Sequence, residues 1–173
     1  MRIFIAIPIS KKLQKEIEKY REFYSDLPAR WLEGKNLHIT LIPPWEEDNI
    51  DEVKDILKTI ESKIGSFEMN FEKVSFGTNS YSPRLIWAIG KTPKQIIELK
   101  KLLENALNMP SERNDFLLHL TLARFRPEDF KNFPVKKIDD KINWREIVEE
   151  FIIMRSHLSR NGAEYEILER FRL

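Results

Sequence analysis

The sequence contains a repeated motif that pairs a histidine with a threonine inside a frame of apolar residues. It reads LHITL at residues 37–41 and LHLTL at residues 118–122, so two of the three histidines in the 173-residue chain share one setting. The two histidines lie 81 positions apart, and a second match, RIFIAIPIS from Arg2 against RLIWAIGKT from Arg84, lies at an offset of 82. Two independent matches at nearly the same offset predict that the chain contains two copies of one unit.

Each copy is predicted to begin with a strand and a helix. Residues 2–9 carry isoleucine at every second position, a period that is typical of a strand. A helix is predicted to start after Ser10, its N-cap, because apolar residues recur at three- and four-residue spacing from residue 13 to residue 24. In the second copy, residues 84–90 form the strand, and Thr92-Pro93-Lys94-Gln95 predicts a capping box for a helix that ends at about residue 108.

The motif strand follows the helix in each copy, and further elements complete the fold. We expect a helix over 53–64, strands over 67–77, 148–158 and 164–171, an irregular connection over 126–143, and a hairpin turn at 159–162. The prediction is an α+β fold, bilobal and internally duplicated, in which two antiparallel sheets flank a central cleft and the helices lie outside. Residues 1–173 are expected to form a single domain of two pseudo-symmetric lobes.

Charge and composition exclude several classes of function. The chain has 29 basic and 28 acidic residues, and its formal charge of +1 gives no overall field for a non-specific coat on nucleic acid. The absence of cysteine excludes disulfides, thiolate metal ligands and a thiol nucleophile. The N-terminal stretch lacks the small-residue cleavage site of a signal peptide, and no apolar run is long enough for a membrane span. We therefore expect a soluble, cytoplasmic monomer without a membrane partner.

The spacing inside each motif places its two polar side chains together. In a strand, residues two positions apart point to the same face, so His38 projects with Thr40, and His119 projects with Thr121. The three apolar residues of each motif point to the opposite face and anchor the strand in a core. If the two copies face each other, two imidazoles and two hydroxyls line the cleft between them.

Two histidines across a small gap suit a reaction that takes one proton and gives another. The reference pKa of histidine, about 6.5, lets one imidazole be neutral while the other is charged. Threonine hydroxyls can hold an anionic oxygen, so the set fits phosphoryl transfer at a diester. A lone histidine in a strand is more often structural, and a zinc site is the chemical alternative. Threonine is a poor zinc ligand and no further ligand pattern is present, so we predict neither a metal nor a cofactor.

These residues resemble the two-histidine (2H) phosphoesterase superfamily, and most closely the RNA 2',3'-cyclic phosphodiesterases, formerly called 2'-5' RNA ligases. The resemblance covers nearly the whole chain and implies a bilobal fold with a water-filled cleft. It also implies metal-independent hydrolysis of a 2',3'-cyclic phosphate at an RNA end to a 2'-phosphate. The matching stretches are MRIFIAI at 1–7, RW at 30–31, NLHITL at 36–41, PRLIWA at 83–88, HLTLAR at 119–124 and RSHLSRNGAEYEIL at 155–168.

The resemblance assigns roles to the motif residues. It makes His119 the general base on water and His38 the acid that protonates the leaving 3'-oxygen. Thr40 and Thr121 correspond to residues that hold the phosphoryl oxygens. The near symmetry of the motifs leaves the order of acid and base open, while the pair itself does not depend on that order.

The chain departs from the family pattern at three places. IPPWEE follows the first motif in place of a basic residue and FLGE, which changes the rim of the cleft, and Leu118 precedes the second histidine where proline is usual. His157 stands where no histidine is expected, and we interpret it as an exposed strand residue. The resemblance favours Arg124 as a substrate-side residue, although regular strand alternation points it away from His119. Arg155 shares strand parity with His157, which allows a substrate-side position at the cleft rim.

Two alternative functions stay open at this point. One is a 2H phosphodiesterase for another cyclic or 2'-5' phosphodiester, and the other is a protein that binds RNA ends without turnover. Both motifs are intact, which favours an enzyme. The expected partners are RNA ends or small cyclic phosphodiesters.

Overall fold

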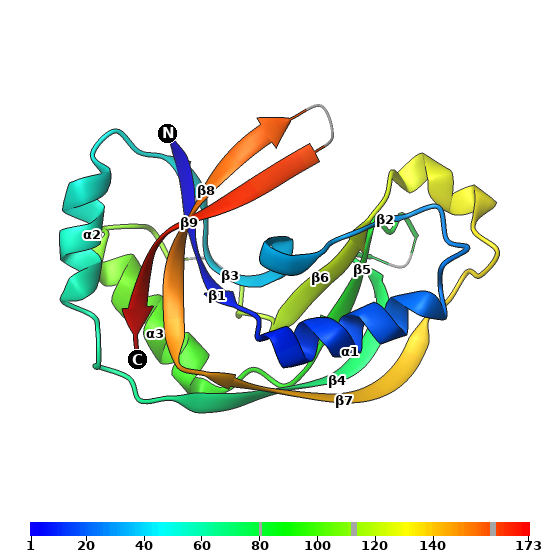
Figure 1. Ribbon diagram of the computed structural model, residues 1–173, viewed down its shortest axis with the longest axis horizontal. Coiled ribbons are helices and arrows are strands. Elements are labelled where there is room, and N and C mark those ends of the chain that lie inside the picture. Colours follow the sequence, from blue (N-terminus) through cyan, green and yellow to red (C-terminus); the bar gives the residue numbers. More distant parts are fainter. Residues whose placement is uncertain (80, 112–113, 160–161) are drawn as a thin grey trace.

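Two antiparallel β-sheets carry the two histidine motifs, one motif in each sheet (Figure 1). The computed structural model describes residues 1–79, 81–111, 114–159 and 162–173. The first sheet has the order β3 (His38–Glu46), β1 (Arg2–Pro8), β8 (Glu150–Ser159) and β9 (Gly162–Arg172). The second has the order β2 (Arg30–Trp31), β6 (His119–Arg124), β5 (Leu85–Ile89), β4 (Phe67–Gly77) and β7 (Asp139–Val148). The α+β class and the two antiparallel sheets are as predicted.

The helices of the described ranges are α1 (Lys11–Glu22), α2 (Ile50–Lys58) and α3 (Lys94–Ala106), with the short 3-10 helices η1 (Gly34–Asn36) and η2 (Pro127–Asn132). The N-cap of α1 is as predicted, because the Ser10 hydroxyl oxygen accepts a hydrogen bond from the Leu13 N–H at 3.2 Å. Within the part of the chain that the structure describes, no helix combines the length and the apolar character that a membrane crossing requires.

The start of α3 differs from the predicted capping box. Pro93 is the N-cap residue, and no side chain caps the helix there. The Thr92 hydroxyl instead donates to the Phe116 carbonyl and accepts from the Leu118 N–H, both at 3.0 Å. A tertiary contact has replaced the local cap, and it fixes the segment that leads into His119.

The strand order confirms the internal duplication. The two units are β1-α1-β3 and β5-α3-β6, and in each unit the motif strand pairs antiparallel with the first strand. On the far side of the first strand, β8 and then β9 extend the first sheet, as β4 and then β7 extend the second.

The strand register corrects the offset of the repeat. Thr40 pairs with Ala6 and Thr121 pairs with Trp87, so equivalent positions lie 81 residues apart in both strands of the unit. The offset of 82 expected from the sequence matched Ala6 with Ala88 instead. A shift of one residue moves a side chain to the other face of its strand. Ala88 accordingly belongs to the main core, whereas Ala6 belongs to a separate apolar cluster.

Each unit places its helix against the sheet of the other unit (Figure 1). α1 follows β1 but contacts β7, where the hydroxyls of Tyr20 in α1 and of Tyr24 just after it donate to Asp140 Oδ2 at 2.7 and 2.6 Å. α3 follows β5 but contacts β3, where Lys100 Nζ donates to the Leu41 carbonyl at 3.2 Å. One hydrophobic cluster includes buried residues of both sheets and both helices. We propose that the chain forms one domain of two lobes, because this exchange gives both lobes a common core.

Strand β7 was not predicted from the sequence. It occupies residues 139–148, the first half of which was expected in an irregular connection, and the strand expected over 148–158 is the end of β7 followed by β8. β8 and β9 pair as the predicted hairpin, whose turn residues 160 and 161 lie outside the described residues. The inward positions of β7 combine two carboxylates with three apolar side chains, namely Asp140, Ile142, Trp144, Glu146 and Val148.

The two inward carboxylates explain why the alternation of β7 was missed. Asp140 accepts hydrogen bonds from Tyr20 in α1 and from Tyr24 just after that helix. Glu146 is buried and accepts hydrogen bonds from the Ser10 N–H at 3.0 Å and the Ser10 hydroxyl at 2.8 Å. Burial raises the pKa of Glu146, against the opposite effect of these hydrogen bonds. A carboxylate at an inward position interrupts the apolar pattern, and its partners come from a helix that is distant in sequence.

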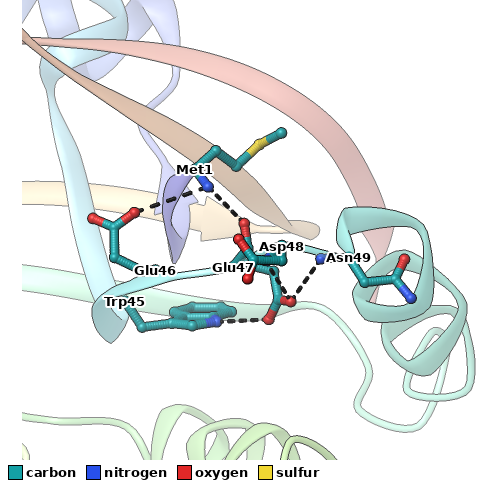
Figure 2. Close-up of polar contacts among 6 residues, drawn as sticks. All are labelled: Met1, Trp45, Glu46, Glu47, Asp48 and Asn49. Carbon is teal, nitrogen blue, oxygen red and sulfur yellow. Dashed lines mark hydrogen bonds and ion pairs between the residues drawn. The ribbon is translucent and has the colours of Figure 1, made fainter.

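Glu47 organises the connection between β3 and α2 (Figure 2). Its carboxylate accepts hydrogen bonds from Trp45 Nε1 at 3.0 Å and from the Asp48 and Asn49 N–H groups at 2.9 Å each. Hydrogen bonds to the charged form, first that from Asn49, lower the pKa of the Glu47 carboxyl. The Met1 amine donates to the Glu47 carbonyl at 2.6 Å. The acidic segment that follows the first motif is therefore engaged in local hydrogen bonds.

Gly90 directly follows β5 and lies against the backbone of β4. A Cβ atom at Gly90 would be 1.9 Å from the Asn70 carbonyl oxygen, whereas a Cβ at Gly65 would meet no atom within 4 Å. We predict that Gly90→Ala lowers the free energy of unfolding by about 3 kcal/mol. Gly65→Ala should change it by less than about 0.5 kcal/mol. Urea unfolding measures both, and similar losses in the two variants would contradict this packing.

Candidate active site

The polar residues of each motif share one face of their strand, as predicted. His38 and Thr40 of β3 are half-buried, as are His119 and Thr121 of β6. The core therefore holds each motif strand from behind and leaves its histidine and threonine on the opposite side. The buried motif residues belong to the main core and are Leu37, Ile39, Leu41, Leu118, Leu120 and Leu122.

A bulge follows the threonine in both motif strands. The register of β3 against β1 skips Leu41, and the register of β6 against β5 skips Leu122. The Leu41 carbonyl accepts from Lys100 Nζ at 3.2 Å, and the Leu122 carbonyl accepts from the Leu32 N–H at 2.8 Å. Each bulge thus has a hydrogen bond from outside its unit's strand pair, which fixes the strand directly after the threonine.

The bulge at Leu122 decides the face on which Arg124 lies. One extra residue shifts the alternation by one, so Arg124 returns to the side of His119 and Thr121. Regular alternation had placed it on the opposite side. The structure corrects that expectation, and Arg124 lines a cavity together with the motif residues.

A small cavity of about 60 Å³ joins the two motifs. A larger cavity of about 710 Å³ lies around Glu146 and includes neither histidine. Within the described ranges, no three side chains of histidine, cysteine, aspartate or glutamate come together as a candidate metal site. The small cavity is lined by His38, Thr40, His119, Thr121 and Arg124, with Leu32 and Asn36 beside them.

A main-chain carbonyl two residues upstream orients each histidine. His38 Nδ1 lies 3.0 Å from the Asn36 carbonyl oxygen, and His119 Nδ1 lies 2.8 Å from the Leu117 carbonyl oxygen. Because a carbonyl oxygen can only accept, Nδ1 carries a proton in each ring. Nε2 of each imidazole is left to exchange a proton with a ligand.

The two histidines differ in their surroundings. The His38 ring packs against Phe4 and Tyr165, with ring centroids 4.9 and 5.1 Å away. Burial, and then electrostatic repulsion by Arg124 and by His119 when that imidazole is protonated, lower the pKa of His38 to about 4, against the opposite effect of its carbonyl partner. With no anion beside it, His38 is therefore neutral at neutral pH.

Arg155 and His157 are not brought to the cavity. Arg155 pairs across the strands with Ile3, a core residue, so it shares the face of Ile3 and not that of Phe4, which contacts the His38 ring. His157 is exposed and lies 3.3 Å from Glu166 Oε2. The prediction that His157 is an exposed strand residue is confirmed, and a substrate-side role of Arg155 stays a prediction.

Two further residues beside the histidines were not predicted. Asn36 lines the cavity, and Trp87 pairs across the strands with Thr121, with its ring 5.4 Å from that of His119. Asn36 ends η1, before β3 begins at His38, so strand alternation does not extend to it. Trp87 could not be assigned without the register between β5 and β6.

The charge of Arg124 is one cause of the lowered His38 pKa, so its removal should be measurable. We predict that Arg124→Met raises the pKa of His38 above its value of about 4, because one positive charge that opposes protonation is lost. Burial remains, so the pKa should stay below the reference value of about 6.5. An NMR titration of the imidazole nitrogens measures it, with Arg126→Met as the control. An unchanged His38 pKa in Arg124→Met would contradict the proximity of the two side chains.

Comparisons with known proteins agree with this fold. The sequence pattern of the 2'-5' RNA ligase superfamily matches residues 9–160. The chain is 29% identical over 181 residues to the RNA 2',3'-cyclic phosphodiesterase of Methanocaldococcus jannaschii, in an alignment that covers 99% of this chain and 100% of the relative. Among solved structures, TT0787 of Thermus thermophilus is similar with a TM-score of 0.79 at 22% identity, over 100% of this chain and 98% of that chain. E. coli LigT complexed with 3'-AMP is similar with a TM-score of 0.77 at 23% identity, over 99% of this chain and 97% of that chain.

The family pattern extends over both motif strands and over α1, α2 and α3, and the Methanocaldococcus relative aligns along its full length. The chain therefore belongs to the 2'-5' RNA ligase superfamily.

Proposed function

We propose that this protein hydrolyses the 2',3'-cyclic phosphodiester at an RNA end to a 2'-phosphate, by acid–base catalysis with His38 and His119 and without a metal ion. The observation that carries the proposal is the cavity of about 60 Å³ in which both motifs and Arg124 meet. The name of the Methanocaldococcus relative and the nucleotide held by LigT support an RNA end as the substrate.

The cavity offers hydrogen-bond donors for an anionic phosphoryl group. The hydroxyls of Thr40 and Thr121 and the guanidinium of Arg124 line the same small space. Donors that are held in place by strands act on the developing charge at phosphorus without having to reorganise. We assign these three side chains to the oxygens of the phosphoryl group that do not belong to the ring.

The two imidazoles act on opposite sides of the phosphorus atom. His119 Nε2 takes a proton from a water molecule as the water oxygen forms a bond to phosphorus. The bond from phosphorus to the 3'-oxygen breaks, and His38 Nε2 gives its proton to that oxygen. The products are a 2'-phosphate and a 3'-hydroxyl, and the enzyme returns to its starting state when His119 releases its proton and His38 takes one up.

His38 must be protonated before it can act as the acid. In the free protein its pKa is lowered to about 4, so the substrate has to change this balance. A phosphodiester anion between His38 and Arg124 offsets the repulsion by Arg124 and favours the imidazolium. Substrate and proton therefore bind together.

The assay that tests the proposal uses RNA ending in a 2',3'-cyclic phosphate in the presence of EDTA, with the product identified by ³¹P NMR. We predict a 2'-phosphate, and a loss of roughly 10²–10⁴-fold in turnover for His38→Ala and for His119→Ala. Activity that disappears in EDTA and returns with zinc or magnesium would sink the metal-independent mechanism. Turnover of another cyclic or 2'-5' phosphodiester alone, or binding without turnover, would favour the alternative functions.

The order of acid and base can be tested with a leaving group that needs no proton. We predict that His38→Ala recovers most of its lost activity on a phosphodiester with a p-nitrophenolate leaving group, because the acid is then dispensable. His119→Ala should stay impaired on the same substrate, since its base is still required. Steady-state kinetics on both substrates measures the difference, and recovery by His119→Ala instead would reverse the assigned roles.

A further inference from the structure

Another cavity, of about 400 Å³ and distinct from the one around Glu146, adjoins the small one and shares Thr40 and His119 with it. We refer to this cavity of about 400 Å³ as the large cavity of the site. Its volume and its mixture of apolar walls with a few polar groups are typical of a site for a small organic group. The walls include Thr40, Pro43, Trp87, Asp115, Leu117 and His119.

The two cavities lie at equivalent places in the duplicated fold but differ in chemistry. The repeat offset makes Leu117 the counterpart of Asn36 and Pro43 the counterpart of Arg124. Asn36 and Arg124 line the small cavity, whereas Leu117 and Pro43 line the large one. The guanidinium of Arg124 therefore directs a phosphoryl group to the small cavity, and the large, more apolar cavity is left for the base of the same nucleotide.

Trp87 forms a fixed aromatic wall of the large cavity. Its Nε1–H donates to the Ser75 hydroxyl at 3.0 Å, which sets the rotation of the ring. Gly77 lets the ring lie against the β4 backbone, because a Cβ atom there would be 2.4 Å from the indole. A ring that is held in this way loses little conformational freedom when a base stacks on it.

Asp115 is the one residue with a carboxylate among the described residues that line this cavity. A carboxylate has two acceptor oxygens side by side. Guanine matches them, because its Watson–Crick edge presents two adjacent donors, the ring N1–H and the exocyclic N2 amino group. Adenine and cytosine place a ring acceptor beside their amino group, and uracil places its single N–H between two carbonyls, so each would face Asp115 with an acceptor.

We propose that Trp87 and Asp115 form a base subsite that selects guanine at the 3' end of the RNA. The proposal rests on the proposed function, since it names the base attached to the cyclic phosphate. The base stacks on the indole, its Watson–Crick edge reaches the Asp115 carboxylate, and its phosphate lies between His38 and His119.

The first test compares four short RNAs that differ in the last base, each ending in a 2',3'-cyclic phosphate. The wild type should hydrolyse the guanosine end with a kcat/KM roughly tenfold or more above the others, as expected for hydrogen bonds to a charged group. Asp115→Asn should lose that advantage, while its kcat/KM for the adenosine and cytidine ends should stay the same or rise, because an amide can donate to their ring nitrogen. Asp51→Asn, on α2, is the matched control and should keep the preference. Equal rates for all four ends in the wild type, or a guanine preference that survives Asp115→Asn, would overturn the proposal.

A second test does not depend on turnover. Calorimetry with guanosine 2'-phosphate and adenosine 2'-phosphate should show tighter binding of the guanosine compound by roughly tenfold, lost in Asp115→Asn. Trp87→Leu should weaken both compounds by a similar factor, roughly tenfold, because stacking is shared by all bases. A wild type that binds the guanosine compound selectively but hydrolyses none of the RNAs would refute the proposed function and leave the subsite standing. Equal binding of the two compounds would refute the subsite.

Discussion

The exchange of helices between the two sheets fixes the distance between the histidine motifs. α1 is joined to β7 through Ser10 and Glu146, and α3 is joined to β3 through Lys100, whose Nζ also lies 2.7 Å from Glu104 Oε1. Separating the sheets would uncover the apolar face of both helices and would remove partners from a buried carboxyl and a buried ammonium group, which is costly for either. A cavity as small as about 60 Å³ can keep its shape because the two strands that form it cannot drift apart without these losses.

The bulges at Leu41 and Leu122 make the two sides of the site chemically different, although the two motif strands are nearly identical. A bulge shifts the alternation of side chains by one, so the residue two positions after the bulged one lies on the face opposite to that expected from regular alternation. The two copies have different residues at this position. In β6 it carries Arg124, and at the equivalent place in β3 it carries Pro43. In the proposed function, near-identical motifs hold the phosphoryl group from both sides, and the guanidinium of Arg124 on one side gives it a preferred orientation.

The sequence predicts this fold and site where local patterns decide the structure, and not where distant partners do. Period-two alternation and the repeated frame were enough to place His38 with Thr40 and His119 with Thr121, because an apolar frame can bury only one face of a strand. Strand β7 was missed because its inward carboxylates at Asp140 and Glu146 are satisfied by α1 and its N-cap, more than a hundred residues earlier. The predicted offset of the repeat was wrong by one for a related reason. Residue identity matched Ala6 with Ala88, whereas the backbone pairing of the strands determines which residues are equivalent.

The pairing of β1 with β8 has a consequence for the order in which the molecule can assemble. β1 spans Arg2–Pro8 and β8 spans Glu150–Ser159, so the central strand of the first sheet finds one neighbour almost a full chain length away. Contacts over such a separation carry a large loop-closure cost and form slowly. On the ribosome, β4, β5 and β6 can emerge and pair while β1 still lacks β8. β1 precedes β8 by more than 140 residues and is thus among the last strands to acquire both of its neighbours, and the sheet that carries His38 closes only when the hairpin of β8 and β9 is available.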